Sequence, residues 1–220
     1  MSIAEKFEVI ADAVYDKGKQ DEYDRFWDAY QDNGNRDFYS YGFSGYGWTN
    51  ENFKPKYPII TSANPNRTNV MFQYAYNLTE IMSPLYFYDT SSSSTFVNCR
   101  NLIKIGDDTG GGIWTTRNRT FTYNFSSCSN LEEIRFIDYN EKGEYVPSEI
   151  GNSIDFSYSP LSVASMINII AHLVNYKDTD NDGVNSVKFT QNCWAALEAY
   201  SAAPDGGKWV DYVANKGWIT

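Results

Sequence analysis

The first part of the chain alternates apolar and polar positions with the period of an α-helix. Apolar residues recur at spacings of four, three and four, at Ile3, Phe7, Ile10 and Val14. Ser2 and Glu5 form the pattern of a capping box, in which two side chains satisfy backbone N–H groups at the start of a helix. A second, aromatic-rich period ends at Asn33 and Gly34, a pair typical of helix C-termini. We therefore predict an N-terminal helical segment over residues 1–36.

Two heptads are too few for an independent coiled coil, so the apolar stripe of this segment has two interpretations. In the first, the helices pack against their own domain. In the second, Ile3, Phe7, Ile10 and Val14 attach the protein to a partner or to a second copy of the chain. The pattern alone leaves both interpretations open.

From residue 38 to residue 53 the pattern changes to aromatic residues separated by Gly, Ser and Asn, which favours extended or looping backbone over helix. The flat faces of Tyr39, Tyr41, Tyr46 and Trp48 could bind sugars, because an aromatic ring with polar neighbours suits a ligand that is partly apolar and partly hydroxylated. The alternative is that these rings close one end of the hydrophobic core.

Three later segments, 72–81, 96–105 and 125–134, align without gaps to the pattern F-x-x-[A/C]-x-N-L-x-x-I. Their first phenylalanines are 24 and 29 residues apart, and the longer interval contains the sequence DDTGGG, which we interpret as a flexible loop. One copy alone cannot bury its Phe, Leu and Ile side chains. Stacked copies bury all of them, at roughly 1.5 to 3 kcal/mol per large side chain. We therefore expect a stacked repeat with one short strand or turn per copy.

The fourth position of the repeat holds Ala75, Cys99 and Cys128 in turn. Because one copy functions with alanine, we interpret both cysteines as small core residues rather than as nucleophiles or metal ligands. Three cysteines and a single histidine supply neither a disulfide framework nor a zinc site, so we expect Cys193 to be a buried free thiol as well.

The last third of the chain changes to alternating helix and strand patterns. An apolar stripe with helical spacing follows Pro160 and consists of Val163, Met166, Ile167, Ile170, Leu173 and Val174. Residues 184–190 have the composition of a strand, residues 193–200 that of a short helix, and residues 216–220 that of a last strand. We expect these elements to cap the stacked repeat, because an uncapped stack exposes its core.

The repeat resembles the BspA-like leucine-rich repeat of bacterial surface proteins and phage genomes, and the match covers about residues 72–136. The N-terminal YDRFWDAYQDNG stretch and the C-terminal KGWIT tail are similar to segments of repeat proteins encoded by phages and prophages of gut bacteria. The resemblance implies an α+β fold, with a short leucine-rich-repeat β-solenoid, an N-terminal helical segment and a C-terminal helix and strand cap. The corresponding divisions are residues 1–36, 37–158 and 159–220.

Charge and composition narrow the range of functions. The chain has 18 Lys and Arg against 28 Asp and Glu, an acidic balance that argues against nucleic acid as a partner. No window approaches eighteen consecutive apolar residues, so we expect no membrane insertion, and the N-terminus lacks the pattern of a secretory signal. Aromatic residues make up 17% of the chain, a load that suits a binding surface.

Candidate catalytic chemistry is sparse. His172 is the only histidine, and on a helical wheel it falls opposite the apolar stripe of its helix. A nucleophile pair built on this histidine would therefore face solvent. Carboxylates are abundant enough to form pairs anywhere in the fold, but abundance alone does not indicate a catalytic pair, and adjacent acids on a strand point to opposite faces. We predict that the protein is not an enzyme.

Asp178, Asp180 and Asp182 follow one another in the order of a calcium-binding loop. The twelfth position of such a loop is Phe189, where an EF-hand has a bidentate glutamate, so the complete motif is absent. Two interpretations remain. One is a shortened calcium site completed by Asn185 or a backbone carbonyl, and the other is a turn that leads into the following strand. No other cofactor is expected.

The resemblance implies a structural protein of a phage virion, of tail-fibre, baseplate or head-fibre type, made in the cytoplasm of the bacterial host. In this interpretation the N-terminal helices bind other virion proteins, the repeat surface binds a glycan or protein of the host envelope, and the chain forms a homo-oligomer. The alternatives are a bacterial surface adhesin of the leucine-rich-repeat class, a glycan-degrading virion enzyme, and a virion decoration or assembly protein with no receptor.

Overall fold

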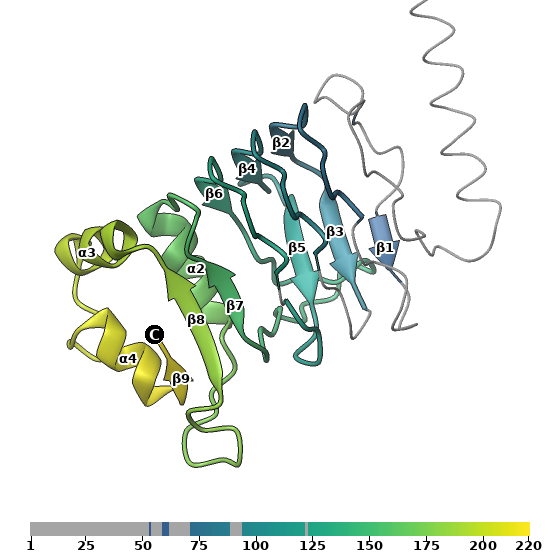
Figure 1. The fold of residues 1–220 in the computed structure, drawn as a ribbon. Coiled ribbons are helices and arrows are strands. Elements are labelled where there is room, and N and C mark those ends of the chain that lie inside the picture. The colour runs from purple at the N-terminus through teal and green to yellow at the C-terminus, as the bar shows by residue number, and fades with distance from the viewer. Residues whose placement is uncertain (1–52, 54–58, 62–70, 89–93, 122) are drawn as a thin grey trace, which may run out of the picture.

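The computed structural model describes residues 53, 59–61, 71–88, 94–121 and 123–220. The prediction of a helical segment over residues 1–36 lies outside this part of the chain. The described residues form an α+β fold of three small parallel sheets and three helices (Figure 1). In Figure 1 the strands of two of these sheets alternate along the chain and the two sheets lie side by side, and the helices lie beside the C-terminal sheet.

The three copies of the repeat each supply one short strand to the same parallel sheet. These strands are β2 (Glu80–Ile81), β4 (Lys104–Ile105) and β6 (Glu133–Ile134). Their register pairs the first residue of each strand with the first residue of the next, and likewise the isoleucines. All three isoleucines are buried, and the charged residues before them lie on the outer face. Equivalent positions of the repeat therefore lie side by side.

The segments before, between and after the repeats build two further parallel sheets. One has the strand order β1-β3-β5 and consists of β1 (Ile59–Thr61), β3 (Pro84–Phe87) and β5 (Gly112–Thr115). The other has the order β7-β8-β9 and consists of β7 (Ile154–Phe156), β8 (Asn185–Phe189) and β9 (Trp218–Ile219). All four residues of β5 are buried, so this strand is covered on both faces, as is typical of parallel sheets.

The helices are α2 (Val163–His172), α3 (Gln191–Tyr200) and α4 (Trp209–Asn215). Ser162 and Thr190 begin the first two, and each side-chain oxygen accepts a hydrogen bond from a backbone N–H in the first turn. Such a cap contributes about 1 kcal/mol. The positions of α2, α3 and β8 agree with the sequence pattern, whereas α4 was not predicted.

A column of phenylalanine rings runs through the core. Phe72, Phe96 and Phe125 begin the three repeats, and their neighbouring ring centroids lie 5.3 and 5.4 Å apart. Phe156 stacks on Phe125 at 4.5 Å, and Phe189 stacks on Phe156 at 6.1 Å. All five rings are buried. The column therefore joins the repeats and the C-terminal sheet in one hydrophobic core.

Each repeat turns sharply two residues after its phenylalanine. Tyr74, Asn98 and Ser127 have φ angles of 62°, 60° and 63°, in the left-handed region that non-glycine residues rarely adopt. The backbone N–H of Tyr74 donates to the carbonyl of Val97 in the next copy, at 3.1 Å. The turn thus has the same conformation in all three copies despite three different side chains.

The cysteines contribute to packing between copies. The Sγ of Cys99 donates to the carbonyl of Phe72 at 2.9 Å, and the Sγ of Cys128 donates to the carbonyl of Phe96 at 3.1 Å. Burial raises the pKa of the Cys99 thiol well above its ordinary value and that of Cys128 to about 12. Both are therefore neutral, weak donors. Cys193 is also buried, and all three thiols are free, in agreement with the sequence.

The predicted leucine-rich-repeat β-solenoid is wrong. The strands of the described residues belong to three separate small sheets, and these do not form a solenoid. The physical reason is that each copy of the repeat specifies a strand of only two residues, while the intervals between copies form longer strands in a sheet of their own. After β6 the chain passes through residues 138–149 and enters a sheet whose other two strands follow helices. The succession of equivalent elements ends there.

Candidate functional site

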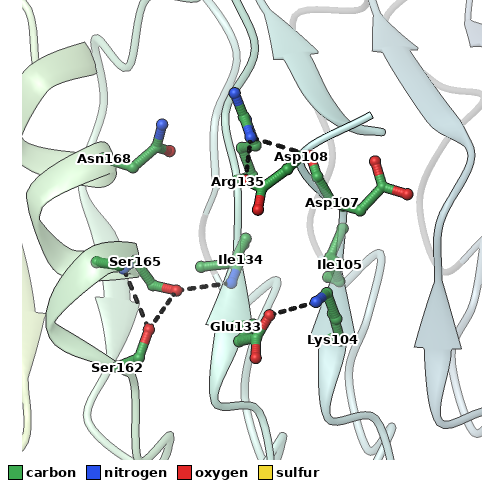
Figure 2. Close-up of a pocket in the computed structure, with 12 residues that line it drawn as sticks. Lys104, Ile105, Asp107, Asp108, Glu133, Ile134, Arg135, Ser162, Ser165 and Asn168 are labelled. Carbon is green, nitrogen blue, oxygen red and sulfur yellow. Dashed lines mark hydrogen bonds and ion pairs between the residues drawn. The ribbon is translucent and has the colours of Figure 1, made fainter. Parts of the chain in front are cut away.

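Helix α2 lies along the edge of the repeat sheet, and its polar side chains make the hydrogen bonds that a further strand would make. Ser165 Oγ accepts a bond from the N–H of Ile134 at 3.0 Å and donates to the carbonyl of Glu132 at 3.3 Å. Asn168 Oδ1 accepts from the N–H of Phe136 at 2.7 Å, and its Nδ2 donates to the carbonyl of the same residue at 3.1 Å. Side chains of α2, and not a further strand, therefore satisfy these backbone groups at the edge of β6. Figure 2 shows the bond from Ile134 to Ser165.

The spacing of these side chains explains how a helix can bond to a strand edge. Ser165, Asn168 and His172 are three and four residues apart, so they share one helix face and advance by about 5 Å per step. Alternate residues of a strand advance by about 6.6 Å, which is close enough for successive contacts. The series continues at His172, whose Nε2 lies 3.0 Å from Oδ1 of Asp138.

A groove opens between α2 and the turn that follows β4 (Figure 2). Its volume is about 550 Å³. Two ion pairs lie in it, with Lys104 Nζ 2.5 Å from Glu133 Oε2 and Arg135 Nη1 2.8 Å from Asp108 Oδ1. The hydrogen bond that Lys104 donates to the Glu133 carboxylate raises the pKa of Lys104. We call this the α2 groove, and it is lined by residues 104–108, 133–135, 162, 164, 165 and 168.

The turn at residues 107–111 forms one wall of the α2 groove. Asp107 Oδ1 accepts three hydrogen bonds, from Oγ1 and N–H of Thr109 at 2.7 and 2.8 Å and from the N–H of Gly111 at 3.1 Å. The bond from the Thr109 hydroxyl, with those from the backbone, lowers the pKa of Asp107. A Cβ at Gly111 would meet the carbonyl of Met82 at 2.0 Å. The flexible loop expected for DDTGGG is therefore a closed turn packed against Met82, between β2 and β3.

A hairpin at residues 138–146, which we call the tyrosine hairpin, presents two exposed aromatic rings. Tyr139 and Tyr145 pair as an antiparallel bridge, and their ring centroids lie 5.5 Å apart with the planes at 73°. Their exposed fractions are 55% and 67%. Paired rings of this size in contact with water mark a candidate binding surface.

The backbone of the tyrosine hairpin is held at its tip and at its base. At the tip, buried Asn140 accepts bonds through Oδ1 from the N–H groups of Lys142 and Glu144, both at 3.0 Å. At the base, the indole Nε1 of Trp114 donates to the carbonyl of Val146 at 2.7 Å. The hairpin therefore covers the outer face of β5 and is fixed to it.

Two hollows flank the tyrosine hairpin. The first, of about 430 Å³, is lined by Tyr139 and shares Asp108, Arg135 and Asn168 with the α2 groove. The second, of about 560 Å³, is lined by Tyr145 together with residues 117, 147–149 and 171–175. Asp138 lines both hollows. The α2 groove, the first hollow and the second hollow are thus linked through shared residues.

The charges of the second hollow are also paired. Arg117 makes a two-bond contact to Glu149, with Nε 3.1 Å from Oε2 and Nη2 2.9 Å from Oε1. This contact raises the pKa of Arg117. The site as a whole offers both hydrogen-bond donors and hydrogen-bond acceptors, and most of its charged groups are paired.

The sequence placed His172 in solvent, and the structure corrects this expectation. The side chain is 8% exposed, because the helix face opposite the apolar stripe contacts the extension of β6 instead of water. Its Nδ1 lies 2.7 Å from the carbonyl of Asn168, and its Nε2 faces Asp138. Both ring nitrogens are therefore engaged by acceptors.

The three aspartates proposed for calcium lie in an exposed turn before β8. The N–H of Asp178 donates to Oδ2 of Asp182 at 3.0 Å, and the Nζ of Lys177 lies 3.8 Å from the same oxygen. Gly183 has a φ of 71° and donates to the carbonyl of Gly217 at 2.9 Å. Among the residues that the structure describes, no three acidic, histidine or cysteine side chains are placed to hold a metal ion, so Asp178, Asp180 and Asp182 do not converge.

Two sets of predicted site residues lie outside the described part of the chain. They are the candidate sugar-binding residues Tyr39, Tyr41, Tyr46 and Trp48, and the candidate attachment residues Ile3, Phe7, Ile10 and Val14. Conversely, the sequence analysis missed the tyrosine hairpin. A signal was present, because Tyr139 and Tyr145 flank Asn140 and Gly143, residues typical of a turn.

None of the helices in the described ranges has the length and apolar character needed to cross a bilayer. Comparisons of the chain with protein-family models, with curated proteins and with solved structures gave no match. The function of the protein is therefore inferred from the geometry of the site and from the sequence.

Proposed function

We propose that the protein is a non-enzymatic structural component of a phage virion, of tail-fibre, baseplate or head-fibre type. In this proposal it binds the envelope of the bacterial host through the face that carries the α2 groove and the tyrosine hairpin. The virion assignment rests on the resemblance of the repeat and of both terminal regions to phage-encoded proteins. The binding role rests on one observation, the exposed tyrosine pair of a hairpin whose backbone is held at tip and base.

Exposed rings contribute little to the stability of their own chain, since burial is what makes an aromatic side chain stabilising. A ligand that covers such rings gains their apolar area at a low entropic cost, because tyrosine has only two side-chain torsions. The hydrogen bonds of Asn140 and Trp114 already hold the backbone beneath Tyr139 and Tyr145. The surface is thus preorganised, which favours affinity.

The electrostatics of this face suit recognition by contact rather than by long-range attraction. The cationic groups of Arg135 and Arg117 are each paired with a carboxylate within about 3 Å. The chain as a whole has a formal net charge of −10. An anionic envelope polymer would therefore gain little from the protein's field.

Residues 1–36 have a separate role in this proposal, which is to attach the chain to neighbouring virion proteins and to further copies of itself. The apolar stripe of Ile3, Phe7, Ile10 and Val14 is the attachment surface. The host-binding face is then separate from this segment, because it consists of the α2 groove and the tyrosine hairpin at residues 138–146.

A cell-binding experiment tests the receptor role. The full chain is labelled with a fluorophore and incubated with host cells, and binding is measured by flow cytometry. The double variant Tyr139→Ala/Tyr145→Ala should bind at least about tenfold more weakly, because aromatic residues dominate many binding interfaces. Tyr158 and Tyr200 are 68% and 69% exposed, so Tyr158→Ala/Tyr200→Ala is a matched control and should bind like the unmodified chain.

The role fails if the unmodified chain does not bind host cells, or if the two double variants bind equally well. Equal melting temperatures of both variants show that the fold is intact. The virion assignment has its own test, in which antibodies against the chain are applied to purified phage particles and imaged by electron microscopy. Unlabelled particles would overturn it.

A further inference from the structure

We propose that the tyrosine hairpin and its two flanking hollows form a binding site for a neutral oligosaccharide of at least two sugar units. This inference rests on the proposed host-binding function and specifies the chemistry of the ligand. One sugar ring lies against Tyr139 at the first hollow, and a second lies against Tyr145 at the second hollow.

The aromatic groups match the shape of a sugar. A pyranose has one face of C–H groups and an edge of hydroxyls, so it packs on an exposed aromatic ring while its hydroxyls reach polar neighbours. Tyr139 and Tyr145 meet at 73° with their centroids 5.5 Å apart, so the two rings present differently oriented faces. Each ring borders a different hollow, which separates the positions of two consecutive sugar units.

The polar groups match the hydroxyl edge. Asp138 lies between the two hollows and lines both, and its Oδ1 is held by Nε2 of His172. Within the described part of the chain no hydrogen bond reaches its Oδ2, which is therefore able to accept from a hydroxyl. Each hollow also contains an ion pair, Arg135 with Asp108 in the first and Arg117 with Glu149 in the second.

Paired charges select a neutral ligand. A hydroxyl donates one hydrogen bond and accepts others, so it can bond to the carboxylate and the guanidinium of one ion pair at the same time. An anionic group would instead meet Asp138, Asp108 and Glu149 in addition to the arginines, and like charges in contact disfavour binding. The formal net charge of −10 also disfavours the binding of an anionic ligand.

An extended peptide is the other occupant to weigh, and the structure disfavours it. Peptides commonly bind as an added strand, which needs free backbone groups at a sheet edge. Along β6 and its extension these groups are already bonded, because Ser165 and Asn168 occupy the N–H groups of Ile134 and Phe136. The adjoining α2 groove therefore offers no strand edge to a peptide.

The experiment uses the full chain and two kinds of probe. The first is an array of neutral and anionic oligosaccharides, and the second is protease-treated polysaccharide extracted from the host envelope, with binding measured by calorimetry. The chain should bind neutral glycans and the extracted polysaccharide, with affinity that changes by less than about twofold between about 50 and 500 mM NaCl. Tyr139→Ala and Tyr145→Ala should each weaken binding by about tenfold. The Tyr158→Ala/Tyr200→Ala control should leave it unchanged.

Three outcomes overturn the inference. They are exclusive binding of anionic glycans with strong salt dependence, binding that survives both hairpin substitutions, and no binding of the extracted polysaccharide. A fourth measurement separates this inference from the proposed function. If cells whose glycans have been oxidised with periodate still bind the chain in a tyrosine-dependent manner, the ligand is a protein, and only the saccharide inference fails. If untreated cells do not bind the chain, the proposed function fails with it.

Discussion

The amide of Asn168 provides a direct test of how the edge of β6 is closed. Its oxygen accepts from the N–H of Phe136 at 2.7 Å and its nitrogen donates to the carbonyl of Phe136 at 3.1 Å. Leucine has the same number of side-chain heavy atoms and the same branch point as asparagine but can neither accept nor donate a hydrogen bond. Asn168→Leu therefore removes both bonds and keeps the length and the branch point of the side chain.

The magnitude follows from the environment of Phe136, which is 1% exposed. A backbone donor that is buried without a partner costs about 1 to 3 kcal/mol, and the lost bond to the carbonyl costs about 1 kcal/mol more. We expect the free energy of unfolding to fall by about 2 to 4 kcal/mol. For a chain of this size, that change lowers the melting temperature by about 5 to 15 °C.

The assay is urea denaturation followed by tryptophan fluorescence, with thermal unfolding as a second measurement. The control is Asn192→Leu, which makes the same chemical change at an exposed position of α3 and should alter the free energy of unfolding by less than about 0.5 kcal/mol. Indistinguishable unfolding midpoints for Asn168→Leu and Asn192→Leu would refute the reasoning, because they would show that Phe136 does not depend on the amide.

Other substitutions probe the core, a close backbone approach and the thiols. Phe96→Ala removes the ring that stacks between Phe72 and Phe125 and should lower the free energy of unfolding by about 3 to 5 kcal/mol in the same urea titration, and a loss below about 1 kcal/mol would contradict the packing. Gly151→Ala places a Cβ 2.2 Å from the carbonyl oxygen of Arg117 and should lower the melting temperature, whereas Gly207→Ala, with its nearest contact at 3.3 Å, should not; equal melting temperatures would disprove the close approach. Burial raises the pKa of Cys128 to about 12, so iodoacetamide at about pH 8.5 should not alkylate this thiol in the native protein and should alkylate it after denaturation, as measured by mass spectrometry. Above about pH 9 the unfolded thiol loses its proton while the native thiol keeps it, so the free energy of unfolding should fall as the pH rises towards 12, and a flat profile would argue against a buried neutral thiol.

The sequence was sufficient to place equivalent residues of the repeat beside one another. Phe72, Phe96 and Phe125 recur with a Leu and an Ile at fixed offsets, and such side chains can be buried together only if the copies stack. The solenoid prediction failed because the path of the chain between two copies depends on the residues of that segment as well as on the repeat motif. Strands β3 and β5 pair through segments that share no motif, and nothing in the ten repeat positions specifies them.

The candidate site could not be predicted from local sequence patterns for a related reason. A turn at Asn140 and Gly143 is readable from composition, but its position over β5 depends on Trp114, which is 32 residues away from its partner Val146. His172 was misplaced because a helical wheel shows only which residues share a face. It does not show whether the polar face of a helix meets water or, as for α2, the edge of a sheet.

Because α2 bonds to the backbone of the third repeat and of the residues that follow it, the tyrosine hairpin is tied to one end of the repeat sheet. The first two copies contact their neighbours through the pairing of equivalent positions, whereas the segments between copies bond to the hairpin through Tyr88 and Trp114. The third copy cannot be shifted, since Ser165 and Asn168 bond to its backbone and to the residues that follow it. A chain with more or fewer copies would therefore have to keep the segments that carry Tyr88 and Trp114 in order to hold the hairpin beside the helix.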